Sequence, residues 1–174
     1  MFKIIACINQ SNVIGNNGNL IYKIPNDLAN FARQTKGNVV IMGRKTFNSL
    51  PNGKPLAERI NIILTRDTEF CVDSEFDNVF ICHTIEEVQE LCNALFAGKE
   101  HFVIGGGEIY KEFLEKGLVD EMRITKVNDS SDGDAVFPRF DDEDEWKTYY
   151  KSMCQTWSEG GVDRSFYYIV YKKN

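Results

Sequence analysis

The chain has 174 residues, of which 43% are hydrophobic and 26% charged, so it is long enough and apolar enough to bury a core as one domain. Its net charge of −6 argues against a general nucleic-acid partner, and no apolar run reaches the roughly 18 residues that a membrane-spanning helix needs. The five cysteines are odd in number and never spaced C-x-x-C, which predicts free thiols rather than disulfides or a metal site.

The N-terminal segment begins with a near-continuous apolar run, Phe2 to Ile8, which predicts a strand buried on both faces. It carries no signal-peptide cleavage pattern, so we expect a cytoplasmic protein. A polar stretch, Asn9 to Asn19, follows and contains the isolated apolar residues Val13 and Ile14. This pattern is typical of a mobile lid, and a plain surface loop with a small hydrophobic anchor is the alternative.

The segment Leu20 to Arg33 predicts a helix that begins at Pro25, where a missing N–H costs nothing. Asp27, Leu28 and Phe31 are three and four residues apart and therefore share one helical face. One carboxylate beside two apolar side chains suits a flat, polar-edged aromatic ligand. The alternative is an ordinary amphipathic helix whose acidic residue complements the helix dipole.

Two predicted strands are each followed by an arginine. Asn38 to Met42 leads into Gly43-Arg44 and a short helix, and Ile60 to Leu64 leads into Thr65-Arg66. Glycine and basic residues at a helix N-terminus favour phosphate. If the two strands are parallel neighbours, Arg44 and Arg66 converge in a way that suits the extra phosphate of a phosphorylated dinucleotide. Two solvated arginines on separate loops are the alternative.

The second half of the chain alternates further strands and helices. Val79 to Cys82 and Phe102 to Ile104 predict buried strands. A capping-box pattern at Thr84 predicts a helix that runs to about Ala97 and stops at Gly98.

Three consecutive glycines, Gly105 to Gly107, precede a helix predicted over Glu108 to Lys116. They permit close approach of backbone N–H groups to a pyrophosphate, although the spacing is not G-x-G-x-x-G. A tight steric turn is the alternative.

The C-terminal part predicts an edge of antiparallel strands. Glu121 to Lys126 alternates as a strand does, and Trp146 to Ser152 with Ser165 to Tyr171 predicts a final antiparallel pair. The acidic run Asp141 to Glu145 predicts a solvated turn. Strands alternating with helices before a terminal hairpin indicate an α/β fold that is mostly parallel.

Taken in order, these segments resemble dihydrofolate reductase of the bacterial type, which uses aspartate in its folate site. The matching segments are Ile5-Ala6-Cys7, Val13-Ile14-Gly15, Ile24 to Leu28 with Phe31, Val40 to Phe47, Arg59 with Asn61 to Leu64, Val103 to Gly107 with Tyr110, and Gly133-Asp134 with Phe137-Pro138. The resemblance implies a three-layer α/β fold with a mostly parallel sheet of about eight strands, a C-terminal antiparallel hairpin and four main helices. It implies a single domain over residues 1–174, with an adenosine-binding subdomain at about 38–107.

The same resemblance implies the reduction of 7,8-dihydrofolate to 5,6,7,8-tetrahydrofolate with NADPH, by hydride transfer to the imine carbon of the pterin. This reaction supplies one-carbon metabolism and the synthesis of thymidylate and purines. It implies antifolate inhibitors as further ligands, a monomer, and no metal, membrane or nucleic-acid partner.

The family's functional positions carry over residue by residue. Asp27 is implied to bind the 2-amino group and ring nitrogen of the pterin, and the implied catalytic group is Asp27, Tyr22, Leu28, Phe31 and Thr125. The implied substrate-binding residues are Ile5, Cys7, Asp27, Leu28, Phe31, Leu50, Leu56, Arg59, Ile104 and Thr125, with Arg59 on the substrate α-carboxylate. The implied cofactor-binding residues are Cys7, Ile14, Gly15, Asn19, Leu20, Gly43, Arg44, Lys45, Thr46, Leu64, Thr65, Arg66, Ile104, Gly106, Gly107, Glu108, Ile109 and Tyr110.

The chain also departs from the family pattern. Ile21-Tyr22 stands where the family usually has Pro-Trp, and Ala135 replaces a usual threonine beside Asp134. Two alternatives accompany the reductase hypothesis: a pyrimidine reductase of the riboflavin pathway, and a non-catalytic nucleotide-binding relative. The set of Asp27, Phe31 and Arg59 argues against the first, and Asp27 with both arginines argues against the second.

Overall fold

The computed structural model describes residues 1–140 and 145–174. Among them, the strands are β1 (Phe2–Ile8), β2 (Val13–Asn16), β3 (Asn19–Leu20), β4 (Val39–Gly43), β5 (Ile60–Leu64), β6 (Val79–Cys82), β7 (His101–Gly105), β8 (Val119–Val127), β9 (Ala135–Val136), β10 (Trp146–Lys151), β11 (Gln155–Glu159) and β12 (Val162–Lys173). The helices are α1 (Pro25–Thr35), α2 (Arg44–Asn48), α3 (Ile85–Leu95) and α4 (Gly107–Glu115), with a 3-10 turn at Pro51–Gly53.

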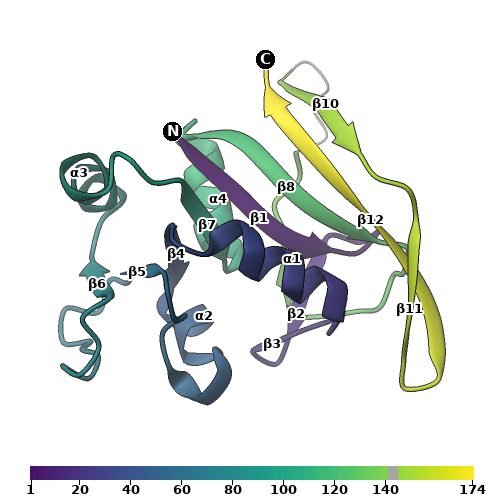
Figure 1. Ribbon diagram of the computed structural model, residues 1–174, viewed down its shortest axis with the longest axis horizontal. Helices are drawn as coiled ribbons and strands as arrows, with labels where there is room; N and C mark the ends of the chain where they lie inside the picture. The colour runs from purple at the N-terminus through teal and green to yellow at the C-terminus, as the bar shows by residue number, and fades with distance from the viewer. Residues whose placement is uncertain (141–144) are drawn as a thin grey trace.

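One large twisted sheet organises the molecule (Figure 1). Its strand order is β10-β12-β8-β1-β7-β4-β5-β6, and β11 pairs with β12 beside that path. The pairs from β8 to β6 are parallel, whereas β12 runs antiparallel to β8, β10 and β11. The predicted mostly parallel α/β sheet with antiparallel strands at its C-terminal edge is confirmed.

The two faces of this sheet carry different helices because successive strand residues point to opposite sides. Alternate residues of β1, such as Ile4 and Ile8, pack in one cluster with residues of α3 and α4, including Val88 and Phe113. On the other face, residues of β4 and β5 such as Met42 pack with residues of α2. Helix α1 lies on that second face, so the expected three layers are present (Figure 1).

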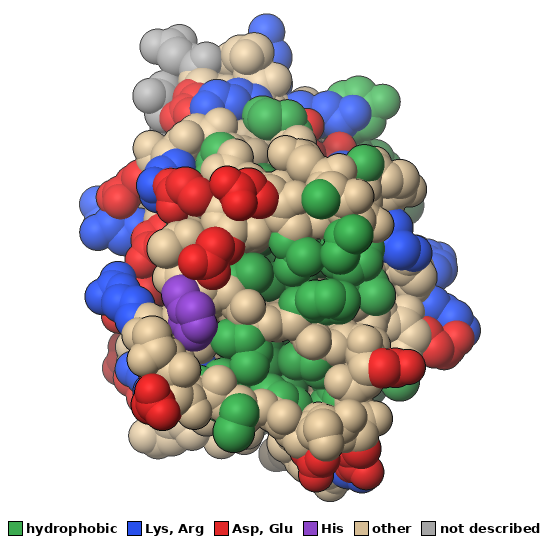
Figure 2. Space-filling model, turned by 90° about the vertical axis from the view of Figure 1, so that its left-hand side faces the viewer, with side chains coloured by type: hydrophobic (Ala, Val, Ile, Leu, Met, Phe, Trp, Pro, Cys, Tyr) green, Lys and Arg blue, Asp and Glu red, His purple; other side chains and the backbone are tan. Residues whose placement is uncertain are grey.

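The edge strand β6 closes the sheet on the side opposite β10 (Figure 1). Figure 2 views this side and shows hydrophobic side chains gathered near its middle, with acidic and basic side chains around them. Val79, Phe80 and Ile81 of this strand are only half-buried. The strand is four residues long, which leaves little exposed backbone for pairing with another chain.

The segment predicted as a lid, Asn9 to Asn19, contains two strands of a second sheet, whereas the sequence predicted a loop throughout it. Strands β2 and β3 form a hairpin across Asn17 and Gly18, whose φ angles are 50° and 74°. An Asn-Gly pair is suited to such a turn because both residues tolerate positive φ. Strand β9 pairs with β2 and ties this hairpin to the segment that follows β8.

One helix end and one strand in the second half of the chain also differ from the prediction. Helix α3 ends at Leu95, short of Gly98, although Thr84 caps its start by accepting the Glu87 N–H at 3.1 Å. Strand β11 and its hairpin with β12 were not predicted, although the turn residues Gly160 and Gly161 are a recognised hairpin signal. The predicted solvated turn lies mostly outside the described residues, since only Glu145 of that run is described.

Three further observations concern the described residues. None of their helices is long and apolar enough to cross a bilayer. No group of three or more histidine, cysteine, aspartate or glutamate side chains among them is arranged to hold a metal ion. The five cysteines are all free thiols.

Candidate active site

Asp27 occupies the first turn of α1, where the helix crosses the sheet. The helix begins at Pro25, directly after the buried Ile24. The hydroxyl of Thr125 on β8 donates a hydrogen bond to the Asp27 carboxylate. Thr125 in turn stands in a row across the sheet, paired with Cys7 on β1 and with Tyr168 on β12. The carboxylate is therefore held above three adjacent strands.

Burial controls the electrostatics of this position. Desolvation raises the pKa of Asp27, and the hydrogen bond from Thr125 opposes that rise. Burial first, and then the Asp27 charge, raises the pKa of Tyr168 to about 12 and raises that of Cys7 well above its ordinary value. A carboxylate in such surroundings gains free energy from a ligand that brings hydrogen-bond donors or positive charge to it.

Apolar side chains flank Asp27. Leu28 is 44% exposed on α1 and Leu20 is 56% exposed at the end of β3, so both present uncovered apolar surface. Half-buried Leu50, Leu56 and Ile104 pack together against the cluster that contains Met42 and Phe47. Uncovered apolar surface next to a carboxylate is the arrangement that the sequence predicted for a flat ligand.

Arg59 lies over the Phe31 ring of α1. Its guanidinium carbon is 5.9 Å from the centroid of the Phe31 ring. Its Nε is buried and has no hydrogen-bond partner among the described residues, and burial lowers the pKa of the group. A buried arginine donor without a partner is costly unless a ligand accepts from it, so this position fits the carboxylate tail of an aromatic ligand.

The N-termini of α2 and α4 meet at the carboxyl ends of β4 and β7. Gly43 and Gly106 are their N-cap residues, and neither helix has a side-chain cap. A Cβ on Gly43 would stand 3.1 Å from Ile109 Cγ1, and one on Gly106 would stand 3.4 Å from Thr46 Oγ1. Uncapped backbone N–H groups in close-packed glycine segments fit a pyrophosphate.

The two arginines follow parallel neighbouring strands, as their predicted convergence requires. Gly43 pairs with Leu64, so Arg44 and Thr65 leave the sheet side by side. Arg44 forms an ion pair with Asp67, and Arg66 forms one with Glu112 at 3.2 Å. The side chains of Arg44 and Arg66 therefore pair with different carboxylates. Both pairs are largely exposed, so a phosphate dianion competes for these arginines at small cost.

The other predicted cofactor residues border the same edge. The buried Tyr110 donates its hydroxyl to the Ile5 carbonyl at 2.9 Å. Gly15 pairs with Leu20 in the hairpin, whose turn residue Asn17 donates its N–H to Asp134 at 3.0 Å. The remaining predicted cofactor residues are half-buried Cys7, Ile14 and Thr46, buried Leu64 and Thr65, half-buried Gly107 and Ile109, and exposed Asn19, Lys45 and Glu108.

Tyr22 anchors the segment that leads into α1. Its side chain is 5% exposed, and its hydroxyl donates to Asp129 while accepting from Asn9 Nδ2 at 3.3 Å. Its ring stacks edge-on against Trp157, with centroids 5.8 Å apart. The hydroxyl is thus bound to the loop after β8 and anchors the segment before α1, and the catalytic role implied for Tyr22 stays a prediction.

Three residues near the site were missed. Tyr168 faces Thr125, but only the register of β12 against β8 reveals this. Asn9 is fully buried and joins Tyr22 to the Ser131 carbonyl at 2.8 Å. Asp129 accepts a hydrogen bond from the Tyr22 hydroxyl. Its pKa is lowered by hydrogen bonds, that from the Ser131 side chain first and then that from Tyr22. Asn9 and Asp129 lie in polar loops, where sequence alone gives no sign of burial.

The fold and the site together define a class of protein. Paired helix N-termini that fit a pyrophosphate accompany a half-buried carboxylate with uncovered apolar side chains, which is the layout of an α/β enzyme that combines a dinucleotide with a flat polar ligand. Comparison with known proteins narrows this class. The dihydrofolate reductase family model matches residues 1–173, so the chain belongs to the dihydrofolate reductase family.

Individual relatives agree with this membership. Dihydrofolate reductase of Bacillus subtilis (strain 168) is 36% identical over 173 residues, which cover 99% of this chain and 95% of the relative. The Staphylococcus aureus enzyme is 33% identical over 161 residues, or 92% of each chain. The solved dihydrofolate reductase of Enterococcus faecalis, complexed with NADP(H) and RAB-propyl, superposes with a TM-score of 0.83 at 26% identity, covering 100% of this chain and 96% of that one.

Proposed function

We propose that this chain reduces 7,8-dihydrofolate to 5,6,7,8-tetrahydrofolate with NADPH and so supplies one-carbon metabolism. The observation that carries the proposal is the Asp27 carboxylate, held by Thr125 beside uncovered Leu28. Family membership supports it, and so does the Enterococcus faecalis relative solved with NADP(H). The pyrimidine reductase alternative has no comparable support.

We propose that the cofactor lies along the edge where β4, β5 and β7 end. Backbone N–H groups after Gly43 and Gly106 would hold the pyrophosphate, and Arg44 with Arg66 would hold the additional phosphate. Residues 38–107 would form the adenosine-binding subdomain. When bound, NADPH supplies the hydride, and the protein contributes orientation and electrostatics.

The substrate would enter between α1 and the 3-10 turn at Pro51–Gly53. Asp27 would accept hydrogen bonds from the 2-amino group and ring nitrogen of the pterin, Leu28 and Phe31 would contact its faces, and Arg59 would bind the tail carboxylate. The hydride adds to the imine carbon and a proton from water adds to the adjacent nitrogen. The Asp27 charge favours the positive charge that develops on the pterin.

We further propose a cytoplasmic monomer that acts on small molecules only, with antifolates as competing ligands. The decisive experiment measures oxidation of NADPH with dihydrofolate as substrate, with and without trimethoprim. Turnover that depends on both substrates and is inhibited by trimethoprim supports the proposal. Binding of dihydrofolate without turnover would refute it, and a single sedimentation species at monomer mass tests the oligomeric state.

A further inference from the structure

A cavity lies between α1 and the C-terminal half of the sheet, on the side of α1 that faces β12. Its volume is about 530 Å³, within the range of ligand pockets in proteins. Its lining includes Arg33 on α1, Thr125 on β8, Tyr150 on β10, and Tyr168 and Lys172 on β12. We call it the tyrosine cavity.

The floor of the tyrosine cavity is one face of the sheet. The register pairs Thr125 with Tyr168, Arg123 with Val170, and Glu121 with Lys172, and it continues from Val170 to Tyr150 on β10. Paired residues at alternate positions point to the same side. The lining is therefore a contiguous surface built by three strands rather than a chance gap between loops.

Aromatic side chains form its outer wall. Tyr149 and Tyr150 are 70% and 53% exposed, although successive strand residues normally point to opposite faces. The register between β10 and β12 shifts between Thr148 and Tyr150, so Tyr149 is the extra residue of a bulge. This irregularity lets both tyrosines line the cavity and leaves large aromatic surface uncovered.

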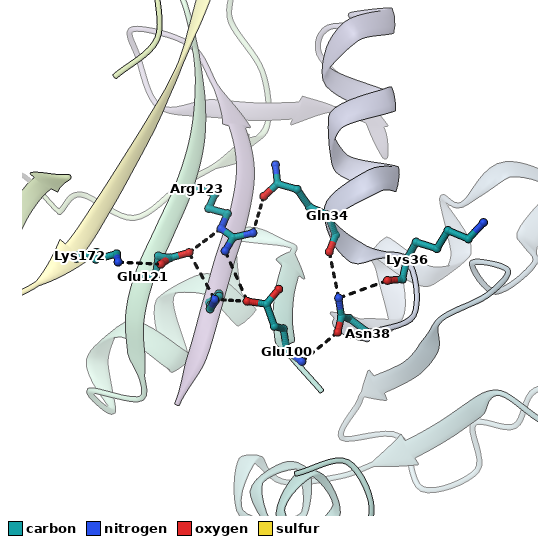
Figure 3. A network of polar contacts seen from close by, with 8 residues as sticks. Gln34, Lys36, Asn38, Glu100, Glu121, Arg123 and Lys172 are labelled. Carbon is teal, nitrogen blue, oxygen red and sulfur yellow. Dashed lines mark hydrogen bonds and ion pairs between the residues drawn. The ribbon is translucent and has the colours of Figure 1, made fainter. Parts of the chain in front are cut away.

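The charge of the lining is positive. It contains three cations, Arg33, Arg123 and Lys172, and one carboxylate, Glu121. Figure 3 shows Arg123 enclosed by Glu121, Gln34 and Glu100. Arg123 Nε donates to Glu121 Oε1 at 2.6 Å, and Arg123 Nη1 donates to Gln34 Oε1 at 2.7 Å. Arg33 bonds only the Asn30 amide oxygen, at 2.8 Å, and has no carboxylate partner among the described residues.

The cavity adjoins the candidate active site at Thr125. Thr125 lines the floor, and its hydroxyl is bonded to Asp27 on the other side. Lys172 lies 3.8 Å from the centroid of the Tyr149 ring and 3.9 Å from Glu121 Oε2, so a cation and a ring already stand together at the entrance. A flat ring with one negative charge satisfies both the tyrosine wall and the surplus positive charge.

We propose that the tyrosine cavity is a second ligand site, next to the proposed substrate site but not part of it, that binds a planar aromatic monocarboxylate. The ring of the ligand lies against Tyr150 and Tyr168, and its carboxylate lies between Arg33 and Lys172. The site is independent of the reductase function, because it rests on the lining residues alone.

The test uses 2-naphthoate as the probe and amide NMR of the uniformly labelled protein. We expect saturable shifts below about 1 mM, centred on Tyr150, Tyr168 and Val170. The neutral analogue naphthalene-2-carboxamide should bind more weakly. Shifts confined to Leu28 and Phe31, or no saturable shift with either probe, would overturn the proposal whether or not the protein reduces dihydrofolate.

Charge variants decide which residues bind the carboxylate. The double variant Arg33→Gln/Lys172→Gln should weaken 2-naphthoate binding by about tenfold, since both charged contacts are lost. Lys111→Gln, which removes an exposed charge on α4, should bind like the parent protein. Equal affinity of the double variant and its parent would refute the site. Should the double variant fail to fold, Arg33→Gln alone gives the same test, because that side chain is exposed.

Discussion

Thr125 on β8 donates its hydroxyl proton to the carboxylate of Asp27 on α1, although the two residues are 98 positions apart in the chain. The bond joins the first turn of α1 to the middle of the sheet. It also opposes the effect of burial, which raises the pKa of Asp27. Burial and the hydrogen bond from Thr125 therefore act on the pKa of Asp27 in opposite directions.

The first prediction concerns catalysis. Asp27→Asn removes the negative charge beside the pterin, so turnover at pH 7 should fall by about 100-fold or more. Activity should recover toward low pH, where the substrate is already protonated. Steady-state rates against pH measure this, with Asp73→Asn on an exposed loop as the matched control. Near-normal activity of Asp27→Asn at neutral pH would contradict the assigned role.

The same substitution has an opposite consequence for stability. The pKa of Asp27 is raised in the folded protein above its ordinary value of about 4. Between these two pKa values the folded state binds more protons than the unfolded state. The free energy of unfolding contributed by this group therefore falls as the pH rises through that window. Asp27→Asn should be more stable than the parent at neutral pH and lose the advantage in acid. Urea unfolding at several pH values tests this, and an advantage independent of pH would contradict it.

The third prediction concerns cofactor choice. Arg44 and Arg66 follow neighbouring parallel strands and each rests on an exposed carboxylate. Replacing both with alanine should reduce the preference for NADPH over NADH by about tenfold to 100-fold, because a charge-assisted contact with the extra phosphate is lost at each. The ratio of kcat/KM values measures the effect. Arg139→Ala, at another exposed position, is the control. An unchanged ratio would place the phosphate elsewhere.

The fourth prediction concerns the segment that leads into α1. Tyr22→Phe removes the hydroxyl that donates a hydrogen bond to Asp129, and should cost about 1.5 kcal/mol of stability because a part-buried bond to a charged group is lost. Tyr150→Phe, at an exposed position, should cost much less. In a double-mutant cycle with Asp129→Ala, the two losses should be less than additive. Additive losses would show that the two groups are not coupled.

The sequence predicts much of this fold because its strands are continuous apolar runs. β1, β4, β5 and α1 begin and end close to their predicted positions, and the parallel pairing of β4 with β5 follows from the alternation of elements. What escaped prediction depends on contacts distant in the chain. The burial of Asn9, the engagement of Tyr22 by Asp129 and the bulge at Tyr149 all arise from register or loop packing, which local patterns do not encode.

The last prediction tests why a glycine stands at the start of α4. A Cβ on Gly107 would lie 2.3 Å from the carbonyl oxygen of Val136 on β9, a backbone atom that cannot rotate away. Gly107→Ala should therefore destabilise the protein by about 1–3 kcal/mol and weaken NADPH binding, because relieving the clash must move either β9 or the N-terminus of α4. Gly98→Ala is the matched control, since a Cβ there meets nothing within 4 Å. Thermal unfolding with and without NADPH separates the two effects: a lowered midpoint without cofactor reports the clash, and a smaller cofactor-induced rise reports the displaced N-terminus. If Gly107→Ala matches Gly98→Ala in both measurements, the close approach of β9 to α4 has no role in either stability or binding.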